Sequence, residues 1–260
     1  MIGILESIGR VVINLFEFWG SWLIISLKSL TLAFSKPFRI KHYLHHLANI
    51  GAGSLPVIAI TSLFTGGVIA LETYEAFHQF NAEFMIGGVV AISMSREMAP
   101  VLTALLLTAR SGSAMAAEIG TMKVTEQIDA LRMMAVDPIK YLITPRVYTS
   151  IIAAVLLTII SDVVGYVGGY VVSVMTFDIN KVLYMKYTQT LVDFGDVIHG
   201  LIKAAIFGLL VSTISCFYGY LTRGGAKGVG ESTTKAVVVS SIAILVSDYL
   251  ITFILRFLNL

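Results

Sequence analysis

Residues 111–145 read SGSAMAAEIGTMKVTEQIDALRMMAVDPIKYLITP, and they form the longest polar interruption between strongly apolar runs. The runs on both sides are long enough to cross a bilayer, so this stretch lies outside the lipid. At about 100° per residue its apolar positions recur as they do in a helix, and one face carries Val124, Ile128, Leu131 and Ala135. The pattern predicts a short amphipathic helix held between two membrane spans.

The acidic residues Glu126 and Asp129 point away from the apolar face of this predicted helix. Gly-Thr at 120–121 is typical of a helix stop followed by an N-cap, and Asp-Pro at 137–138 is typical of a stop behind the helix. We therefore expect one helix between these two signals. It either docks on a partner protein or lies at the membrane surface with its charges in water.

The composition excludes a soluble protein. The chain has 260 residues, of which 57% are hydrophobic and only 13% are charged, whereas soluble domains contain about 25% charged residues. The net charge of +2 is too small to indicate binding of nucleic acid. The single cysteine, Cys216, excludes an internal disulfide and argues against a cysteine-based metal site.

The predicted N-terminal domain, residues 1–46, precedes the membrane spans. Residues 4–34 have apolar side chains at helical spacing, but polar residues interrupt them, so we expect an interfacial helix rather than a span. Residues 35–46 are a basic connector with three histidines. These are either metal ligands or interfacial residues near lipid headgroups, and they are His42, His45 and His46.

Residues 47–260 form the second predicted domain, which consists of membrane spans and their connections. Apolar runs long enough to cross a bilayer predict five spans, at about 47–71, 84–109, 147–174, 199–221 and 236–257. A polar region at 111–146 separates the second span from the third. The fold class is therefore all-α integral membrane protein.

Lysine and arginine are unevenly distributed among the connections. The connection at 72–83 has none, and the one at 175–198 has two lysines outnumbered by aspartates, whereas the other connections are basic. Basic connections stay in the cytoplasm. We therefore expect the N-terminus in the cytoplasm and the C-terminus on the far side of the membrane.

The second predicted span carries Arg96-Glu97 near its centre, among small residues and shortly before Pro100. A charged residue at a helix centre costs about 2.5–3.5 kcal/mol on insertion scales, so these side chains must face protein or water. Adjacent residues on a helix point about 100° apart and need separate partners. We expect Glu97 to line, or to hold closed, a lipid-accessible cavity at a dimer axis, with Arg96 turned to a neighbouring helix or a lipid phosphate.

Other charged residues lie in or near the predicted spans, namely Asp162, Asp248 and Lys203. All these charged groups either pair with one another to fix the helix bundle or take part in transport. The acids also support an alternative function, an ion-coupled secondary transporter or channel that uses Glu97, Asp162 and Asp248 as a relay.

No enzyme motif is present in the sequence. The glycine-rich segment RGGAKGVGEST at 223–233 lacks the Gly-Lys-Ser/Thr of a phosphate-binding loop, and we interpret it as a flexible turn. The serine hydrolase motif G-x-S-x-G and the zinc motif H-E-x-x-H are missing as well. We therefore predict a protein that is not an enzyme, with no metal or cofactor of its own.

Two segments of the sequence resemble a known family, the MlaE/YrbE-type permeases. They are REMAPV at 96–101 and RSGSAMAAEIGTMKVTEQIDALRMMAVDP at 110–138. These permeases are membrane subunits of bacterial ABC transporters that work with MCE-domain lipid-binding proteins. The resemblance runs from about residue 45 to the C-terminus.

The resemblance implies a homodimeric inner-membrane permease that moves phospholipid between the inner and outer membranes and contributes to outer-membrane lipid asymmetry. Its implied partners are a cytoplasmic ATPase that binds ATP and magnesium, a periplasmic MCE-domain protein and a small cytoplasmic accessory subunit. Residues 111–146 would then be a coupling region, in which we expect the ATPase contacts to be Glu118, Lys123, Glu126, Gln127, Asp129, Arg132 and Asp137.

Overall fold

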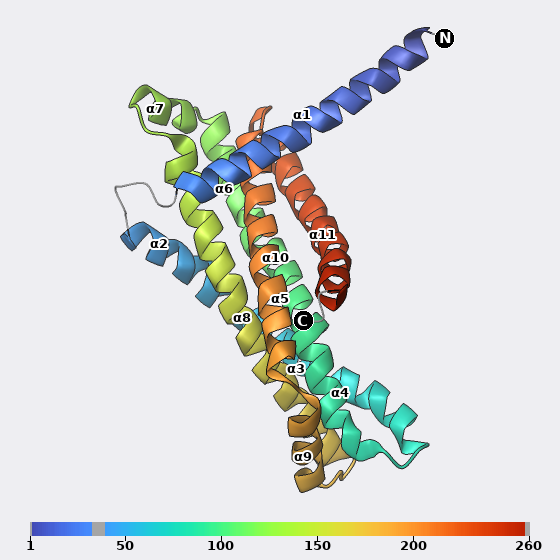
Figure 1. Ribbon diagram of the computed structural model, residues 1–260. Coiled ribbons are helices and arrows are strands. Elements are labelled where there is room, and N and C mark those ends of the chain that lie inside the picture. The colour runs from blue at the N-terminus through green and yellow to red at the C-terminus, as the bar shows by residue number, and fades with distance from the viewer. Residues whose placement is uncertain (1, 33–39, 258–260) are drawn as a thin grey trace.

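The computed structural model of the chain describes residues 2–32 and 40–257, and every regular element within them is a helix (Figure 1). Five helical runs are long and apolar enough to cross a membrane: Ile40–His78, Glu83–Val124, Ile139–Thr176, Phe194–Tyr220 and Gly225–Phe257. The predicted fold class, an all-α membrane protein with five spans, is confirmed.

Three of these runs contain single π-turns between or beside their α-helices, and the second run also begins with a short 3-10 helix. The first contains α2 (Ile40–Leu47), η1 (Ala48–Ala52) and α3 (Gly53–His78). The second contains η2 (Glu83–Met85), α4 (Ile86–Ser93), η3 (Met94–Met98), α5 (Ala99–Leu107), η4 (Thr108–Gly112) and α6 (Ser113–Val124). The third contains η5 (Ile139–Ile143), α8 (Thr144–Val171) and η6 (Val172–Thr176).

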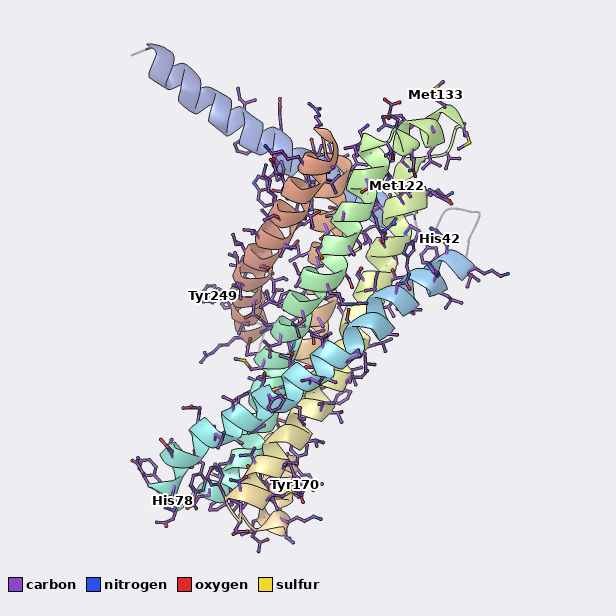
Figure 2. All side chains as sticks on the ribbon, turned by 180° about the vertical axis from the view of Figure 1, so that it is seen from behind. His42, His78, Met122, Met133, Tyr170 and Tyr249 are labelled. Atoms are coloured by element: carbon purple, nitrogen blue, oxygen red, sulfur yellow. The ribbon has the colours of Figure 1, made fainter. Side chains whose placement is uncertain are left out.

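The remaining helices are α1 (Ile2–Leu32), α7 (Gln127–Met133), α9 (Lys181–Leu191), α10 (Phe194–Tyr220) and α11 (Gly225–Phe257). Figure 2 shows Met133 and His42 at one end of the bundle and His78 and Tyr170 at the opposite end. The first of these ends, which carries α6 and α7 (Figure 1), is called the α7 end below.

Proline explains the position of three π-turns. Pro56, Pro100 and Pro145 lie just beyond η1, η3 and η5. Each lacks the N–H that would bond to the carbonyl four residues earlier, and that carbonyl lies inside the π-turn. The helix then widens by one residue without stopping. Pro100 is thus the sequence feature that places Arg96 and Glu97 in a π-turn.

Glycines allow α3 and α8 to pack with their backbones nearly in contact. A Cβ at Gly66 would lie 1.8 Å from the carbonyl oxygen of Gly165, and one at Gly168 would lie 2.0 Å from that of Leu63. Ser62 and Ser161 share a hydrogen bond of 2.6 Å between their hydroxyl groups at the same crossing. Small residues at a membrane helix interface permit this approach.

Helix α1 runs across the α7 end of the bundle and extends beyond it (Figure 1). It contacts α8, α10 and η5. The ring of Phe18 packs edge-on against that of Phe217 at 5.0 Å, and Lys28 Nζ lies 3.0 Å from Asp137 Oδ2. These contacts attach its C-terminal part to the bundle. Its position at the membrane interface remains a prediction.

Two local predictions were wrong. The segment at 223–233 is not a flexible turn, because α11 begins at Gly225 and the turn is limited to the few residues before it. There is also no single helix from Thr121 to Asp137. Instead α6 continues through Gly120 to Val124 and a left-handed Glu126 (φ 61°) separates it from α7. Thr222 packs against Gly120, so this glycine serves helix packing rather than a stop.

Candidate functional site

A buried lysine connects three spans. Lys203 of α10 is 1% exposed, and its Nζ lies 2.5 Å from Glu97 Oε2 of η3 and 2.9 Å from Asp248 Oδ1 of α11. The contact with Asp248 has the distance of an ion pair without the angles of a hydrogen bond. A buried ammonium group is tolerated only when it is paired, so these carboxylates hold Lys203 between the helices.

Arg96 makes a separate ion pair. Its Nε donates to Oδ1 of Asp196, which is 3% exposed at the start of α10. The other oxygen of Asp196 accepts the backbone N–H of Asp193 at 2.9 Å, which completes a capping box. Arg96 and Glu97 thus have different partners, as adjacent helix positions require, and both partners belong to α10.

Gly200 sets the distance between α10 and the π-turn η3. A Cβ at this position would lie 2.0 Å from the carbonyl oxygen of Ser95, so only glycine lets α10 approach closely enough for both ion pairs. Pro100 is buried beside this contact, and its Cγ lies 3.8 Å from the position that a Cβ at Gly200 would occupy. The close approach therefore depends on one glycine and one proline.

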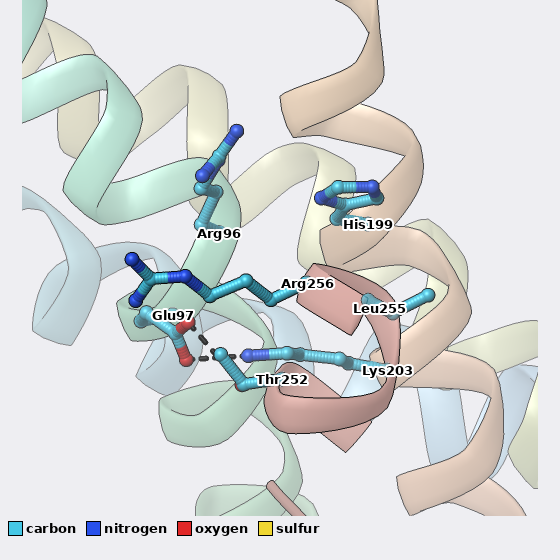
Figure 3. A pocket seen from close by; sticks show the side chains of 7 residues that line it. All are labelled: Arg96, Glu97, His199, Lys203, Thr252, Leu255 and Arg256. Carbon is cyan, nitrogen blue, oxygen red and sulfur yellow. Dashed lines mark hydrogen bonds and ion pairs between the residues drawn. The ribbon is translucent and has the colours of Figure 1, made fainter. Parts of the chain in front are cut away.

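A cavity of about 580 Å³ opens beside these ion pairs (Figure 3). It is lined by residues of η3, α10 and α11: Arg96, Glu97, His199, Lys203, Thr252, Leu255 and Arg256. Figure 3 shows the Arg256 side chain reaching across the cavity toward Glu97. Guanidinium and ammonium groups bind phosphate oxygens well. The cavity therefore offers cationic donors to an anion between membrane helices.

The three intramembrane acids are not brought together. Glu97 and Asp248 share Lys203, whereas Asp162 of α8 has one oxygen that is buried without a hydrogen-bond partner among residues 2–32 and 40–257. In that part of the chain no hydrogen bond links Asp162 to the other two acids, and Lys203, which bridges them, makes no ion pair with it. A continuous relay through all three is therefore not formed here.

The predicted coupling residues are held in several different ways. Asp129 of α7 accepts Lys123 Nζ at 3.1 Å and Arg132 Nη1 at 3.3 Å. Arg132 also donates to the hydroxyl of Tyr220 at the end of α10. Ile128 is fully buried beneath them. These contacts fix α7 on the bundle.

The other predicted coupling residues lie around α7. Glu126 is exposed in the turn before it, and Gln127 Nε2 donates to Thr125 Oγ1 at 3.0 Å. Glu118 lies further back on α6, with its Oε2 2.9 Å from Arg146 Nη2. Their role in coupling remains a prediction.

Asp137, beyond α7, receives Lys28 from α1 and the backbone N–H of Ile139 at 2.9 Å. Burial alone would raise the pKa of this carboxyl group, but the Lys28 ammonium group and the Ile139 N–H outweigh it and hold the pKa below its ordinary value. Asp137 thus links α1 to the loop that follows α7.

Sequence reasoning missed several features of the site, Arg256 among them. Asp196 was not expected as the partner of Arg96, although Asp196, Gly200 and Lys203 recur at spacings that share one helix face. Met133 and Met134 were not singled out, although they are 89% and 65% exposed at the tip of α7. The sequence pattern alone does not distinguish exposed methionines from core methionines. The distinction requires knowing that α7 ends at Met133.

The predicted histidine cluster belongs to α2. The ring of His42 stacks on that of Tyr141 with 5.4 Å between the ring centroids. The ring of His46 meets the His42 ring edge-on, with 4.8 Å between centroids. Within the described ranges no three histidine, cysteine or acidic side chains are placed to hold a metal ion.

Comparison with known proteins identifies the family. The sequence model of the family described as Permease MlaE matches residues 43–254. The chain belongs to the MlaE permease family. A probable ABC transporter permease protein of Rickettsia bellii is 46% identical over 252 residues, which cover 97% of each chain. The predicted resemblance is thus confirmed, and the chain is a multi-pass membrane permease.

Two further relatives have a lipid in their names, and one of these names also states a function. The intermembrane phospholipid transport system permease protein MlaE of Haemophilus influenzae is 34% identical over 259 residues, or 98% of each chain. The chloroplastic protein TRIGALACTOSYLDIACYLGLYCEROL 1 of Arabidopsis thaliana is 40% identical over 212 residues, which are 82% of this chain and 61% of that protein.

Proposed function

We propose that this chain is the permease subunit of an ATP-driven ABC transporter that moves phospholipid between the bacterial inner and outer membranes and contributes to outer-membrane lipid asymmetry. The observation that carries this proposal is the cationic cavity between η3, α10 and α11 in a member of the MlaE permease family. A phospholipid phosphate suits the guanidinium groups of Arg96 and Arg256, while acyl chains suit the apolar helix faces around them.

The proposed assembly contains two copies of this chain. Helix α11 has little buried surface of its own and exposes a row of large apolar side chains, including Ile242, Val246 and Phe253. A second copy would cover part of such a face and close the cavity around a twofold axis. The chain lacks a nucleotide-binding motif, so ATP and magnesium would bind to a cytoplasmic ATPase subunit that docks at the α7 end.

The remaining partners follow from the proposed orientation. With the α7 end in the cytoplasm, the N-terminus is cytoplasmic, the C-terminus is periplasmic, and α9 lies on the periplasmic side. A periplasmic MCE-domain protein would receive or deliver lipid on the side of α9. A small cytoplasmic accessory subunit would complete the complex.

The test is ATP-dependent lipid transfer by the reconstituted complex. The permease, ATPase and MCE-domain subunits from one organism are placed in liposomes, and a fluorescent phospholipid is followed from donor to acceptor membranes. We expect transfer with ATP and none with an ATPase subunit that cannot hydrolyse it. Transfer by the permease alone, driven by a proton or sodium gradient, would overturn the proposal in favour of an ion-coupled transporter.

A further inference from the structure

A second cavity, of about 690 Å³, lies at the α7 end of the bundle and shares no lining residue with the first. It is lined by α2, η1 and the start of α3 on one side and by η4, α6, η5 and α8 on the other. Its polar lining includes Arg110, Arg146, Glu118 and the histidines of α2. The predicted coupling region therefore backs onto a partly open cavity whose mixed lining includes charged side chains.

Arg146 supplies a buried donor to this cavity. The residue is 6% exposed; its Nη1 donates to the carbonyl of Leu142 at 2.8 Å and its Nη2 to Glu118 at 2.9 Å. Its Nε is buried without a hydrogen-bond partner among the residues that the structure describes, and so is His46 Nε2. Buried polar atoms in proteins nearly always have a partner. A group with acceptor oxygens in the cavity would satisfy this N–H once the Arg146 side chain turns its Nε toward the cavity.

Arg110 supplies a second guanidinium group at the rim. Its Nη1 donates to the carbonyl of Asn49 and to the hydroxyl of Ser54, both at 3.1 Å, and both acceptors are neutral. A Cβ at Gly53 would lie 2.1 Å from Arg110 Nη2, so a larger residue here would displace the guanidinium from this position. With neutral imidazoles, the two arginines and Glu118 leave the cavity with one net positive charge.

An apolar groove continues from Arg110. It has a volume of about 200 Å³ and is lined by Ser54, Val57, Leu106, Ala109 and Arg110. Arg110 is therefore shared by a cationic cavity and an apolar groove between α3 and α5. A free phosphate would use only the first of these, whereas a phospholipid has a phosphate for the cavity and an acyl chain for the groove.

We propose that this cavity binds the phosphodiester of a phospholipid from the membrane leaflet at the α7 end, with Arg110 and Arg146 on the phosphate and an acyl chain in the groove along Val57 and Leu106. The site is distinct from the transport cavity at Glu97. It binds lipid without ATP or partner subunits, so it does not depend on the function proposed above.

The test is photolabelling of the full-length permease in nanodiscs that contain phosphatidylglycerol with a diazirine near the head of one acyl chain. Labelled peptides are quantified by mass spectrometry. We expect labelling of the 106–109 peptide to fall about tenfold in Arg110→Gln, because a charge-assisted contact is lost. Gly53→Ala, which displaces the guanidinium but keeps its charge, should reduce labelling in the same direction. Labelling at Ile242 on the exposed face of α11 should not change.

The matched control is Arg132→Gln, which removes an arginine at the same end of the bundle but outside the cavity. It should label like the unmodified chain. A photoreactive diacylglycerol, which has no phosphate, should label weakly and be indifferent to Arg110→Gln. Equal phosphatidylglycerol labelling of Arg110→Gln and the unmodified chain would overturn the proposal, as would displacement of the lipid by excess inorganic phosphate, which would indicate a site for the free anion.

Discussion

At the scale of single residues, Lys203 is the centre of the transmembrane site. It is nearly fully buried, and two carboxylates from different helices neutralise it. Glu97 is more accessible than Lys203, with 36% of its side chain exposed, and it lines the cavity. The two members of this ion pair therefore differ in their surroundings. The buried charge of Lys203 must be neutralised by a carboxylate, whereas Glu97 is exposed to the cavity.

This asymmetry predicts different outcomes for two substitutions. In Glu97→Gln, Asp248 still neutralises Lys203, and we expect normal yield and assembly but loss of lipid transfer and altered ATP hydrolysis. In Lys203→Met, Glu97 and Asp248 are left without their cation. Removing one partner of a buried ion pair costs about 3–5 kcal/mol, so we expect a lower midpoint of thermal unfolding in detergent.

Thermal unfolding, size-exclusion profile and lipid transfer are measured on both variants. Thr252→Val is a control, because it removes a hydroxyl that lies 3.4 Å from Glu97 and 2.9 Å from the carbonyl oxygen of Asp248 but leaves all three charged groups in place. Normal transfer by a well-assembled Glu97→Gln protein would refute the functional role. A misassembled Glu97→Gln protein would show that the residue is structural instead.

At the scale of elements, α7 differs most from its prediction. The amphipathic pattern correctly placed Ile128 on a buried face. The acidic residues on the other face, however, differ in whether they form ion pairs. Asp129 is engaged by Lys123 and Arg132, whereas Glu126 is exposed in the turn before α7. Glu126 and Met133 are thus among the exposed residues that a partner could contact.

Charge reversal at Glu126 tests this surface. We expect Glu126→Lys to weaken copurification of the ATPase subunit without affecting insertion, because it places an unmatched charge at the interface. Glu75→Lys makes the same change at the opposite end of the bundle and should have no effect. Asp129→Lys should also lower stability, because it repels Lys123 and Arg132. Unchanged ATPase binding by Glu126→Lys would contradict this prediction and favour the alternative, in which the helix lies at the membrane surface.

The attachment of α1 is expected to depend on pH through Asp137. Because the folded-state pKa of Asp137 lies below its ordinary value of 3.8, the stabilisation is complete above that value and is lost as pH falls through the folded-state pKa. The only tryptophans, Trp19 and Trp22, are on α1 and report its docking.

We therefore expect the tryptophan emission of the unmodified protein to shift to the red on acidification below pH 3.8. In Asp137→Asn the shift should already be present at neutral pH, and emission should change little with acid. Lys28→Met, which removes the other partner, should behave in the same way. An acid response that survives in Asp137→Asn would assign the effect to other carboxyl groups.

At the scale of the whole molecule, length and apolar composition were sufficient to predict the five spans, because a bilayer allows few other structures for such a sequence. The sequence also showed which charged residues need partners, because the free energy of placing a charge in lipid does not depend on the fold. It did not show which residues pair with one another. Asp196 was assigned to a connection, and only the close approach at Gly200 brings it to Arg96. Such contacts between distant segments leave only weak signals in one sequence.

The orientation of the whole bundle is a prediction from the uneven distribution of lysine and arginine, and labelling of exposed cysteines tests it. Cys216 is fully buried and is replaced by serine to give a background without thiols. Ala226 at the α7 end and Ala76 at the opposite end are both exposed. In intact cells a cysteine at position 76 should react with an impermeant thiol reagent, and one at position 226 should react only after the membrane is opened. The reverse pattern would place α7 on the periplasmic side, where no cytoplasmic ATPase could reach it. It would refute both the proposed docking surface and the proposed orientation of the chain.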